Sequence, residues 1–299
     1  MDAPASADFE APAEVVLGIG ELLWDLLPAG PRLGGAPFNA IAHLARLGYA
    51  ATYVTSVGAD DLGLAALAAA RRLGVDQRYI RTVDLPTGTA RVRLDADGSP
   101  QFEIAQPTAY EDIDLTDAEV GEIASRHPRA VVFGTLAQRS PAVRAVTDRL
   151  IDALPTALRV YDVNLRTDCW SPSLVDDLMR RATIAKLNVD EMTGLAAQFH
   201  APAEPPMAFC AAVAERFRLL GVCVTRGPLG ACLWLEGGYL EDPGVPVRVV
   251  DTVGAGDAFT AALIDGLIRR DEPGRILRSA NALGAFVASR PGAVPEPDG

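Results

Sequence analysis

The most informative stretch of the sequence is DTVGAGDAFTAALI, residues 251–264. The small residues Gly254, Ala255 and Gly256 lead directly into a helix with apolar periodicity, so their N–H groups and the positive end of the helix can receive an anion. Asp257 follows in the first turn. It is either an ordinary capping residue or a carboxylate that orients an attacking hydroxyl beside an anion hole. The stretch alone leaves open both a capped helix and a site for phosphoryl transfer.

The composition is that of a globular protein. The chain has 299 residues, of which 49% are hydrophobic and 22% charged, which is enough apolar material for a sizeable core. With 27 basic and 39 acidic residues the net charge is −12, so neither nucleic acid nor an anionic membrane is an expected partner. Residues 1–13 have no basic start and no apolar run. We expect a disordered tail there, not a secretory signal, and a cytoplasmic protein.

Several classes of protein are excluded by motifs that the sequence lacks. The single lysine, Lys186, is followed by Leu187, so no Walker A loop can exist. Gly18 and Gly20 begin a dinucleotide-binding pattern, but Leu23 stands where its third glycine is needed, which argues against a nicotinamide oxidoreductase. The cysteines form no CxxC pair and have apolar neighbours, which predicts buried free thiols and no structural zinc; they are Cys169, Cys210, Cys223 and Cys232.

Apolar runs of strand length alternate with helical patterns along most of the chain. Strands are expected at residues 15–19, 22–27, 51–56, 130–133, 159–163, 184–187, 222–225, 231–235 and 239–241, and helices at 118–126, 141–153, 207–219, 255–269 and 274–289, besides two that end near residues 48 and 73. This alternation predicts an α/β fold with a mostly parallel sheet covered on both faces. Between residues 87 and 104 the period changes to two around a turn at 95–99. We therefore expect a hairpin in a small sheet that stands off the main domain.

Two motifs resemble those of a known family. The segment DTVGAGDAF resembles the C-terminal signature of the ribokinase-like, or PfkB, carbohydrate kinases, and GGAPFNAIAHLARLG, residues 34–48, is similar to their N-terminal signature. The resemblance covers residues 15–295. It implies a ribokinase-like three-layer α/β/α fold with a mostly parallel central sheet and a small β-sheet lid. One kinase domain is expected at 14–295, with lid segments at about 21–34 and 86–106 and a short tail at 296–299.

The resemblance also assigns residues to a nucleotide side. It implies that Asp257 is the catalytic base, with Gly254, Ala255 and Gly256 as the anion hole, and its place at a helix N-terminus predicts a low pKa. The motif KLNVDE implies that Asn188 and Glu191 act through waters on Mg²⁺ and the phosphates; the residues alone would equally fit a capped helix. The motif TRGPLG resembles a nucleotide loop, or a plain hairpin turn. The remaining implied positions are Thr225, Gly227 and Gly230 in that loop, Asn281 at the adenine pocket, and Asp251 at a monovalent-cation site, where K⁺ would bind with backbone near Val253, Val287, Arg290 and Gly292.

A sugar side is implied by the N-terminal half. Asp25 stands where the family grips sugar hydroxyls, and Gly34, Gly35 and Asn39 match the substrate-binding glycines and amide. A carboxylate and an amide together suit vicinal hydroxyls. Arg166, in the motif NLR, can reach substrate or phosphate, or can be a surface residue with a carboxylate partner. Asp25 could likewise be a solvated strand residue.

The function expected from this resemblance is an ATP-dependent sugar kinase. The segments PTGTARV, GTLAQRS and NLRTDCW look most like the fructokinase branch, which implies conversion of D-fructose to fructose 6-phosphate with ATP and Mg²⁺. Family members often pair their lids, so a homodimer is expected. The alternatives are a 2-keto-3-deoxygluconate, ribose or nucleoside kinase, or a catalytically silent sugar-binding regulator on the same fold.

Overall fold

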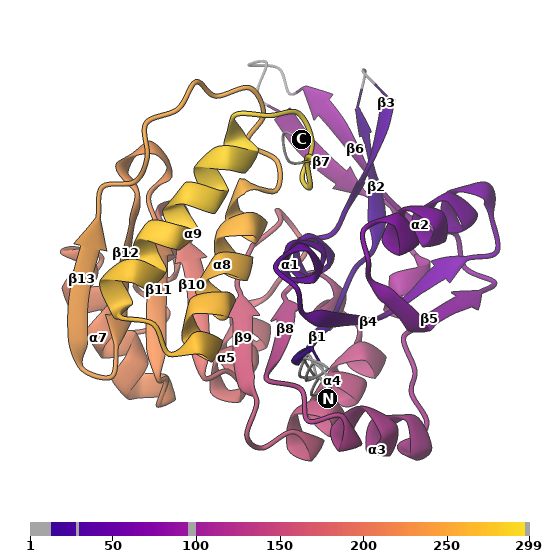
Figure 1. Cartoon of the computed structure of the whole chain (residues 1–299), viewed down its shortest axis with the longest axis horizontal. Coiled ribbons are helices and arrows are strands. Elements are labelled where there is room, and N and C mark those ends of the chain that lie inside the picture. Colours follow the sequence, from indigo (N-terminus) through magenta and orange to yellow (C-terminus); the bar gives the residue numbers. More distant parts are fainter. Residues whose placement is uncertain (1–12, 28–29, 95–99, 297–299) are drawn as a thin grey trace, which may run out of the picture.

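A computed structural model describes residues 13–27, 30–94 and 100–296 of the chain (Figure 1). The expected tail before residue 13, the turn at 95–99 and the last three residues lie outside the described residues. No helix in the described part of the chain has both the length and the apolar character needed to cross a bilayer.

The main body of the protein is built on one large sheet. Its strand order is β13-β12-β11-β10-β9-β8-β1-β4-β5, and all neighbouring pairs from β11 to β5 are parallel, whereas β12 and β13 are antiparallel additions at one edge. The strands are β1 (Val15–Ile19), β4 (Ala50–Gly58), β5 (Asp76–Val83), β8 (Ala130–Gly134), β9 (Leu158–Asp162), β10 (Ile184–Asn188), β11 (Gly221–Thr225), β12 (Ala231–Leu235) and β13 (Gly238–Asp242). The predicted α/β fold is confirmed.

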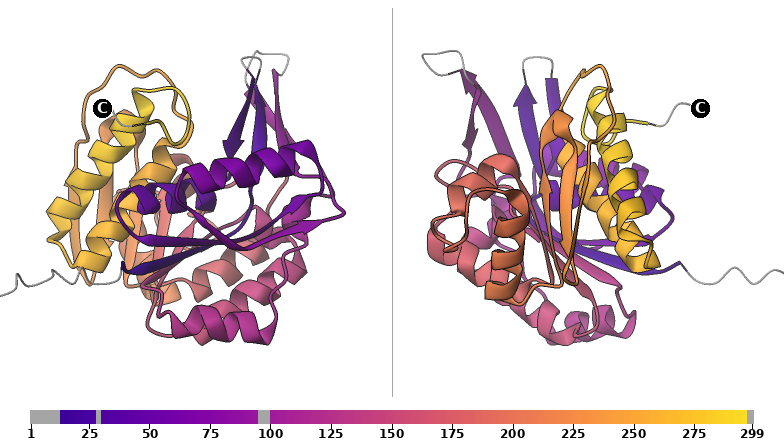
Figure 2. Two further views of the ribbon diagram at one scale, coloured as in Figure 1. Left: turned by 45° about the vertical axis from the view of Figure 1, so that its right-hand side comes forward. Right: turned by 90° about the vertical axis from the view of Figure 1, so that its left-hand side faces the viewer.

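Helices cover both faces of this sheet, so that the protein has three layers (Figures 1 and 2). One buried core joins the sheet to α3 (Asp117–Ser125), α4 (Pro141–Ala153), α5 (Pro172–Arg181), α6 (Val189–Leu195) and α7 (Pro206–Phe217). A second core joins the opposite face to α1 (Ala36–Arg46), α2 (Asp61–Arg72), α8 (Ala255–Arg269) and α9 (Pro273–Ala288). The near-continuous burial of the central strands explains why they read as unbroken apolar runs.

A second, smaller sheet projects from the main body (Figure 2). Its order is β3-β2-β6-β7, from β2 (Leu23–Leu27), β3 (Gly30–Gly34), β6 (Gly88–Leu94) and β7 (Pro100–Ile104). The antiparallel β6–β7 pair confirms the predicted hairpin. A parallel β2–β6 pair then joins segments that are 65 residues apart in the chain.

Two edge strands were not predicted. Strand β3 contains Pro31 and begins and ends with glycine, a composition that predicts a turn. Proline is tolerated here because β3 is an edge strand, where the missing N–H would face solvent instead of a neighbouring strand. Strand β5 has the polar sequence DQRYIRTV and is largely half-buried, which hides the apolar pattern on which a prediction depends.

The parallel strands all point their carboxyl ends at one edge of the large sheet. In open α/β sheets this edge is where ligands bind. The segments that follow β1, β8, β9, β10 and β11 converge here, and the small sheet begins beside them, because β2 follows β1 directly.

Candidate active site

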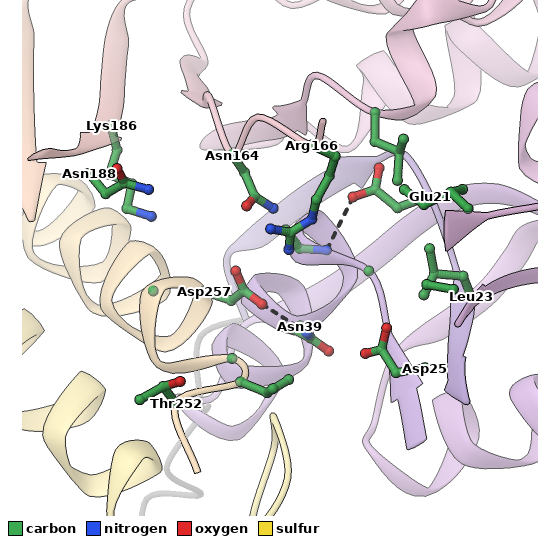
Figure 3. Close-up of a pocket in the computed structure, with 18 of the residues that line it drawn as sticks. Glu21, Leu23, Asp25, Asn39, Asn164, Arg166, Lys186, Asn188, Thr252 and Asp257 are labelled. Carbon is green, nitrogen blue, oxygen red and sulfur yellow. Dashed lines mark hydrogen bonds between the residues drawn. The ribbon is translucent and has the colours of Figure 1, made fainter. Parts of the chain in front are cut away.

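A cavity of about 320 Å³ lies at the carboxyl edge of the large sheet, between that sheet, the small sheet and the N-terminus of α8 (Figure 3). Its walls combine charged groups, amides and backbone from segments far apart in the chain. The lining residues are Glu21, Leu23, Asp25, Gly35, Ala36, Asn39, Ala90, Ile104, Leu136, Asn164, Arg166, Lys186, Asn188, Thr225, Thr252, Val253, Gly254, Gly256 and Asp257.

The N-terminus of α8 forms one wall, and glycine is required there. Gly254 is the N-cap and has φ 79°, in the left-handed region. A Cβ atom at this position would lie 2.4 Å from the Cα of Ala293. Gly254 therefore satisfies both a backbone conformation and a close approach that a side chain would prevent. No side chain caps this helix, and the N–H of Ala255 donates to the carbonyl oxygen of Thr252 at 3.2 Å. The positive end of the helix therefore faces the cavity without a capping side chain and can receive an anion.

Asp257 and Asn39 meet in the cavity. The Nδ2 of Asn39 donates a hydrogen bond of 2.8 Å to Oδ2 of Asp257 (Figure 3). Asn39 lies in α1, which starts after Gly35 at φ 122°. A Cβ atom at Gly35 would lie 2.2 Å from the carbonyl oxygen of Glu21, so this glycine lets α1 begin directly against the end of β1. The bond orients Asp257, and among the described residues no side chain donates a hydrogen bond to its Oδ1.

The pKa of Asp257 is raised, not lowered. Burial is the largest cause, the Asp162 carboxylate adds to it, and the hydrogen bond from Asn39 and the charge of Lys186 oppose it, with a resulting pKa of about 6. The expectation of a low pKa from the helix N-terminus is therefore wrong, because loss of hydration and a like charge outweigh the favourable end of the helix. A carboxylate with this pKa is ionised at neutral pH and is a better base than an ordinary aspartate.

The single lysine of the sequence, Lys186, lies next to Gly256 at the start of α8. Lys186 Nζ is 3.1 Å from both carboxylate oxygens of Asp162, and Thr260 Oγ1 donates to Asp162 Oδ2 at 2.7 Å. Burial lowers the pKa of Lys186, but the carboxylates of Asp162, Glu191 and Asp257 outweigh it and raise the pKa above its usual value. The lysine is therefore a fixed positive charge, and a Cβ atom at Gly256 would lie 3.1 Å from its Nζ.

Carboxylates also line the opposite wall, next to the small sheet. Asp25 on β2 lies against Gly34, where a Cβ atom would come 2.7 Å from its Oδ2. Burial raises the pKa of Asp25. Burial also raises the pKa of Glu21 to about 7. Arg166 lines the cavity although it is exposed overall. Its positive charge lowers the pKa of both groups and of Asp257.

Asn188 and Glu191 form a reciprocal cap at the start of α6. Asn188 Oδ1 accepts from the N–H of Glu191 at 2.9 Å, and Glu191 Oε2 accepts from the N–H of Asn188 at 2.8 Å. Glu191 Oε1 accepts from the N–H of Leu165 at 2.8 Å. Asn188 lines the cavity, but the buried Glu191 lies behind it. The capped-helix interpretation of this motif thus describes the geometry.

The other residues predicted from sequence lie outside the cavity lining. Gly34 and Ala255 adjoin lining residues. Gly227 begins the short turn Gly227–Leu229, and Gly230 follows it directly. Asn281 lies in α9 and donates to Asp242 Oδ1 at 2.6 Å. Asp251 accepts from the N–H groups of Val253 and Gly292 and forms an ion pair with Arg32.

Four polar cavity residues were missed by the sequence analysis: Glu21, Asn164, Lys186 and Thr252. Glu21 directly follows the buried strand β1, and Lys186 is a charge inside the apolar run IAKL. Both residues could have been predicted from the sequence, because each is a charged residue at the carboxyl end of a buried parallel strand. A charged side chain that is buried there needs a ligand or a partner of opposite charge.

Comparison with known proteins matches residues 30–298 to the pfkB family carbohydrate kinases. The chain belongs to this family. Similar proteins include fructokinase-1 of Oryza sativa subsp. japonica, which is 29% identical over 95% of this chain and 94% of its own length. A fructokinase of Klebsiella pneumoniae is 30% identical over 92% of this chain and 94% of its own length.

Solved structures agree on the architecture of this kinase. A fructokinase with bound ATP from Xylella fastidiosa has a TM-score of 0.83 at 23% identity, covering 94% of each chain. An uncharacterised sugar kinase from Pyrococcus horikoshii in complex with ATP has a TM-score of 0.79 at 26% identity, also over 94% of each chain. The expected ribokinase-like fold and the expected ATP:sugar phosphotransferase class are confirmed.

Proposed function

We propose that this kinase transfers the γ-phosphoryl group of ATP to the terminal hydroxymethyl of D-fructose, giving fructose 6-phosphate and ADP. The similarity to fructokinases over nearly the whole chain supports the sugar. The observation that carries the proposal is the hydrogen bond between Asn39 and Asp257, because it places a partly buried base with a free oxygen between a carboxylate-lined wall and an uncapped helix N-terminus.

The sugar is held by the wall that adjoins the small sheet. Asp25 and Asn39 bind hydroxyls, one as an acceptor and the other as both donor and acceptor. The backbone of Gly34 and Gly35 lets the sugar approach closely, and Arg166 binds an oxygen of the substrate or of the transferred phosphoryl group. A buried bond to a charged group contributes about 1.5–3 kcal/mol, so Asp25→Ala weakens sugar binding by about 10- to 100-fold.

The chemical step is an in-line displacement. The sugar oxygen forms a bond to the γ-phosphorus while the bond from that phosphorus to the β–γ bridging oxygen breaks, and ADP leaves with the electron pair. Oδ1 of Asp257 accepts the hydroxyl proton, while Oδ2 stays bonded to Asn39. The backbone at Gly254, Ala255 and Gly256 stabilises the charge on the transferred group through the N–H groups of the two glycines and the positive end of α8, because the N–H of Ala255 donates to the carbonyl oxygen of Thr252. The positive charge of Lys186, which lies next to Gly256, adds to this stabilisation.

Nucleotide binding is assigned to the other side of the cavity. Asn188 and Thr225 face the phosphates, the turn at Gly227 and Gly230 borders the nucleotide, and Asn281 lies toward the base. Within the described residues, no three histidine, cysteine or carboxylate groups form a metal cluster. Mg²⁺ usually keeps several waters and is held by one or two protein groups plus substrate phosphates, and Asn188 with Glu191 behind it fits that need. When bound, Mg²⁺ neutralises phosphate charge.

We assign the small sheet the role of a lid over the sugar, in a kinase domain at 14–295 with lid segments at about 21–34 and 86–106. A lid excludes water, which would otherwise compete for the phosphoryl group. Pairing of two lids in a homodimer would cover the exposed edges of a four-stranded sheet. The net charge of −12 and the free cysteines among the described residues fit a cytoplasmic enzyme.

An ADP-release assay over a panel of sugars tests the proposed function. Fructose is expected to have the highest kcat/KM among fructose, ribose, 2-keto-3-deoxygluconate and adenosine, and Asp257→Asn enzyme purified in parallel reports any contaminating kinase. If kcat/KM for ribose or another member of the panel exceeds that for fructose by tenfold, the assignment as a kinase stands and fructose is not its substrate. Calorimetric binding of fructose without any ADP release would favour the silent regulator.

A further inference from the structure

An ion pair connects the small sheet to the loop that precedes α8. Arg32 Nη1 of β3 donates to Oδ2 of Asp251. The same oxygen accepts from the N–H of Gly292 at 3.1 Å, and Oδ1 accepts from the N–H of Val253 at 3.0 Å. The side chains are 34% and 16% exposed, so this pair is partly shielded from water.

Asp251 is the residue at which the family resemblance implies a monovalent cation. Alkali cations bind through the lone pairs of carboxylate and carbonyl oxygens, and each donor that an oxygen already accepts reduces the capacity that is left for a cation. Here each oxygen of Asp251 already accepts a backbone N–H, and one also accepts a guanidinium. A second positive charge beside Arg32 would be repelled at contact distance. The residues present therefore do not fit K⁺.

The electrostatics of Asp251 agree with a permanent partner. Burial raises the pKa of this carboxyl, but the N–H donors of Val253 and Gly292 and the charge of Arg32 outweigh burial, and the pKa lies below its usual value. Arginine stays charged at every pH that the enzyme meets and binds carboxylates in a directed way. The guanidinium can thus neutralise Asp251 as a bound cation would. Because it is covalently part of the chain, it cannot dissociate when the cation concentration in solution falls.

We propose that Arg32 takes the place of the monovalent cation, so that the anion-hole loop of this kinase is held by its own small sheet and turnover needs no K⁺. This inference rests on the proposed ATP-dependent kinase function. Arg32 is a positioning residue: through Asp251 it holds Val253 and Gly292, and the neighbouring Ala293 is in turn the residue that packs against Gly254.

The register of the small sheet places Arg32 next to a residue of the proposed sugar wall. Arg32 on β3 is paired directly with Asp25 on β2. The strand pair therefore carries the proposed sugar ligand and the Asp251 partner side by side. Displacement of this part of the sheet moves both groups together, which couples the sugar wall to the anion hole.

The first test compares wild-type enzyme in KCl, NaCl and tetramethylammonium chloride at equal ionic strength. We expect kcat/KM for ATP to agree within twofold among the three salts. Stimulation by K⁺ of tenfold or more over tetramethylammonium would overturn the inference. If no sugar were phosphorylated in any salt, the proposed function would fail, and calorimetry with a non-hydrolysable ATP analogue in the same salts would decide the cation question separately.

The second test uses Arg32→Gln, with Arg32→Lys as the conservative variant. Arg32→Gln is expected to lose at least tenfold in kcat/KM for ATP in tetramethylammonium and to regain part of this loss in K⁺, because the vacated carboxylate can then accept the ion. Arg32→Lys should keep most activity without K⁺. Unchanged activity of Arg32→Gln in tetramethylammonium would overturn the inference, and thermal unfolding of each variant checks that it is folded.

Arg46→Gln is the matched control. Arg46 of α1 contacts the same C-terminal segment, through the carbonyl of Pro295 and the carboxylate of Glu296, but it does not contact Asp251. This variant is expected to stay insensitive to K⁺. K⁺ activation of Arg46→Gln equal to that of Arg32→Gln would show a general loosening of the segment and would contradict the specific role of Arg32.

Discussion

Asn39 and Asp257, 218 positions apart in the chain, share a 2.8 Å hydrogen bond at the centre of the cavity. Asn39 lies in the segment that resembles the N-terminal signature of the family, and Asp257 lies in the segment that resembles its C-terminal signature. The bond brings the proposed sugar side and the proposed phosphoryl-transfer side of the cavity to a single carboxylate. Its consequences can be separated by substitution.

Removal of the proposed base is the most direct prediction. Asp257→Asn keeps the shape and the bond to Asn39 in altered form but cannot accept a proton. We expect kcat to fall by about 10²–10⁴-fold, the loss that accompanies removal of a general base, while sugar binding measured by calorimetry changes little. Near-normal turnover would leave Asp257 as a helix-capping residue only.

The pH profile of kcat/KM should report the pKa of Asp257. With this value at about 6, activity is expected to fall as the pH drops below 6, because the protonated carboxyl cannot accept the sugar proton. The bond from Asn39 lowers this pKa, so Asn39→Ala should move the acid limb to higher pH as well as weaken sugar binding. If the acid limb stays at the same pH in Asn39→Ala, the hydrogen bond from Asn39 does not influence the pKa of Asp257, and the prediction is wrong.

Two glycines at the start of α8 should respond unequally to alanine. Gly254→Ala places a Cβ atom 2.4 Å from the Cα of Ala293 at a left-handed φ, a conformation that costs about 1–2 kcal/mol for an L-residue before any clash is counted. Gly256→Ala meets only the flexible end of Lys186, at 3.1 Å. We expect Gly254→Ala to lose far more activity and melting temperature than Gly256→Ala. Equal effects would contradict the proposed packing of the anion hole.

The buried pair of Lys186 and Asp162 should behave as one unit in unfolding. Lys186→Met leaves the carboxylate of Asp162 buried beside Thr260 without its cation, and loss of one partner of a buried pair costs about 3–5 kcal/mol. The double variant Lys186→Met with Asp162→Asn removes the stranded charge and should regain most of that stability in urea unfolding. Both variants should lose activity, since Lys186 lines the cavity. A double variant no more stable than the single one would show that packing, not charge, sets the cost.

Glu21 should make stability depend on pH. Its pKa is about 7 in the folded protein, against an ordinary value of 4.5, so the folded state holds the proton more tightly. The stability from this group is therefore complete below pH 4.5 and is lost as the pH rises to about 7. Glu21→Gln should unfold with a free energy about 3 kcal/mol above wild type at pH 8 but close to it at pH 4.5.

The control for that measurement has the opposite sign. Backbone N–H donation from Thr116 is the largest influence on Glu119 and holds its pKa below the ordinary value. Stability from Glu119 is therefore present at neutral pH and lost as the pH falls, so Glu119→Gln should destabilise the protein at neutral pH. A pH-independent effect of Glu21→Gln would mean that Glu21 is not protonated on folding.

Local patterns in the chain were sufficient for much of this protein. The alternation of apolar runs and helical periods predicted the α/β architecture, because periodicity follows from the geometry of each element alone. The small residues before α8 and α1 marked the two signatures, since close approach and positive φ demand glycine wherever they occur. The hairpin β6–β7 was predicted from a period of two around a turn, which is also a property of the local sequence.

Other features of the fold and of the site depend on which strands lie side by side, and the strand order cannot be predicted from any local sequence pattern. The polar edge strand β5 and the proline-containing β3 form because a neighbouring strand offers hydrogen bonds, not because of their own composition. The pKa of Asp257 was predicted in the wrong direction because burial and the distant Asp162 outweigh the helix end on which it stands. The ion pair between Arg32 and Asp251, 219 positions apart, likewise arises only when the small sheet is folded against the loop before α8, where charges that are far apart in the chain share one poorly hydrated space.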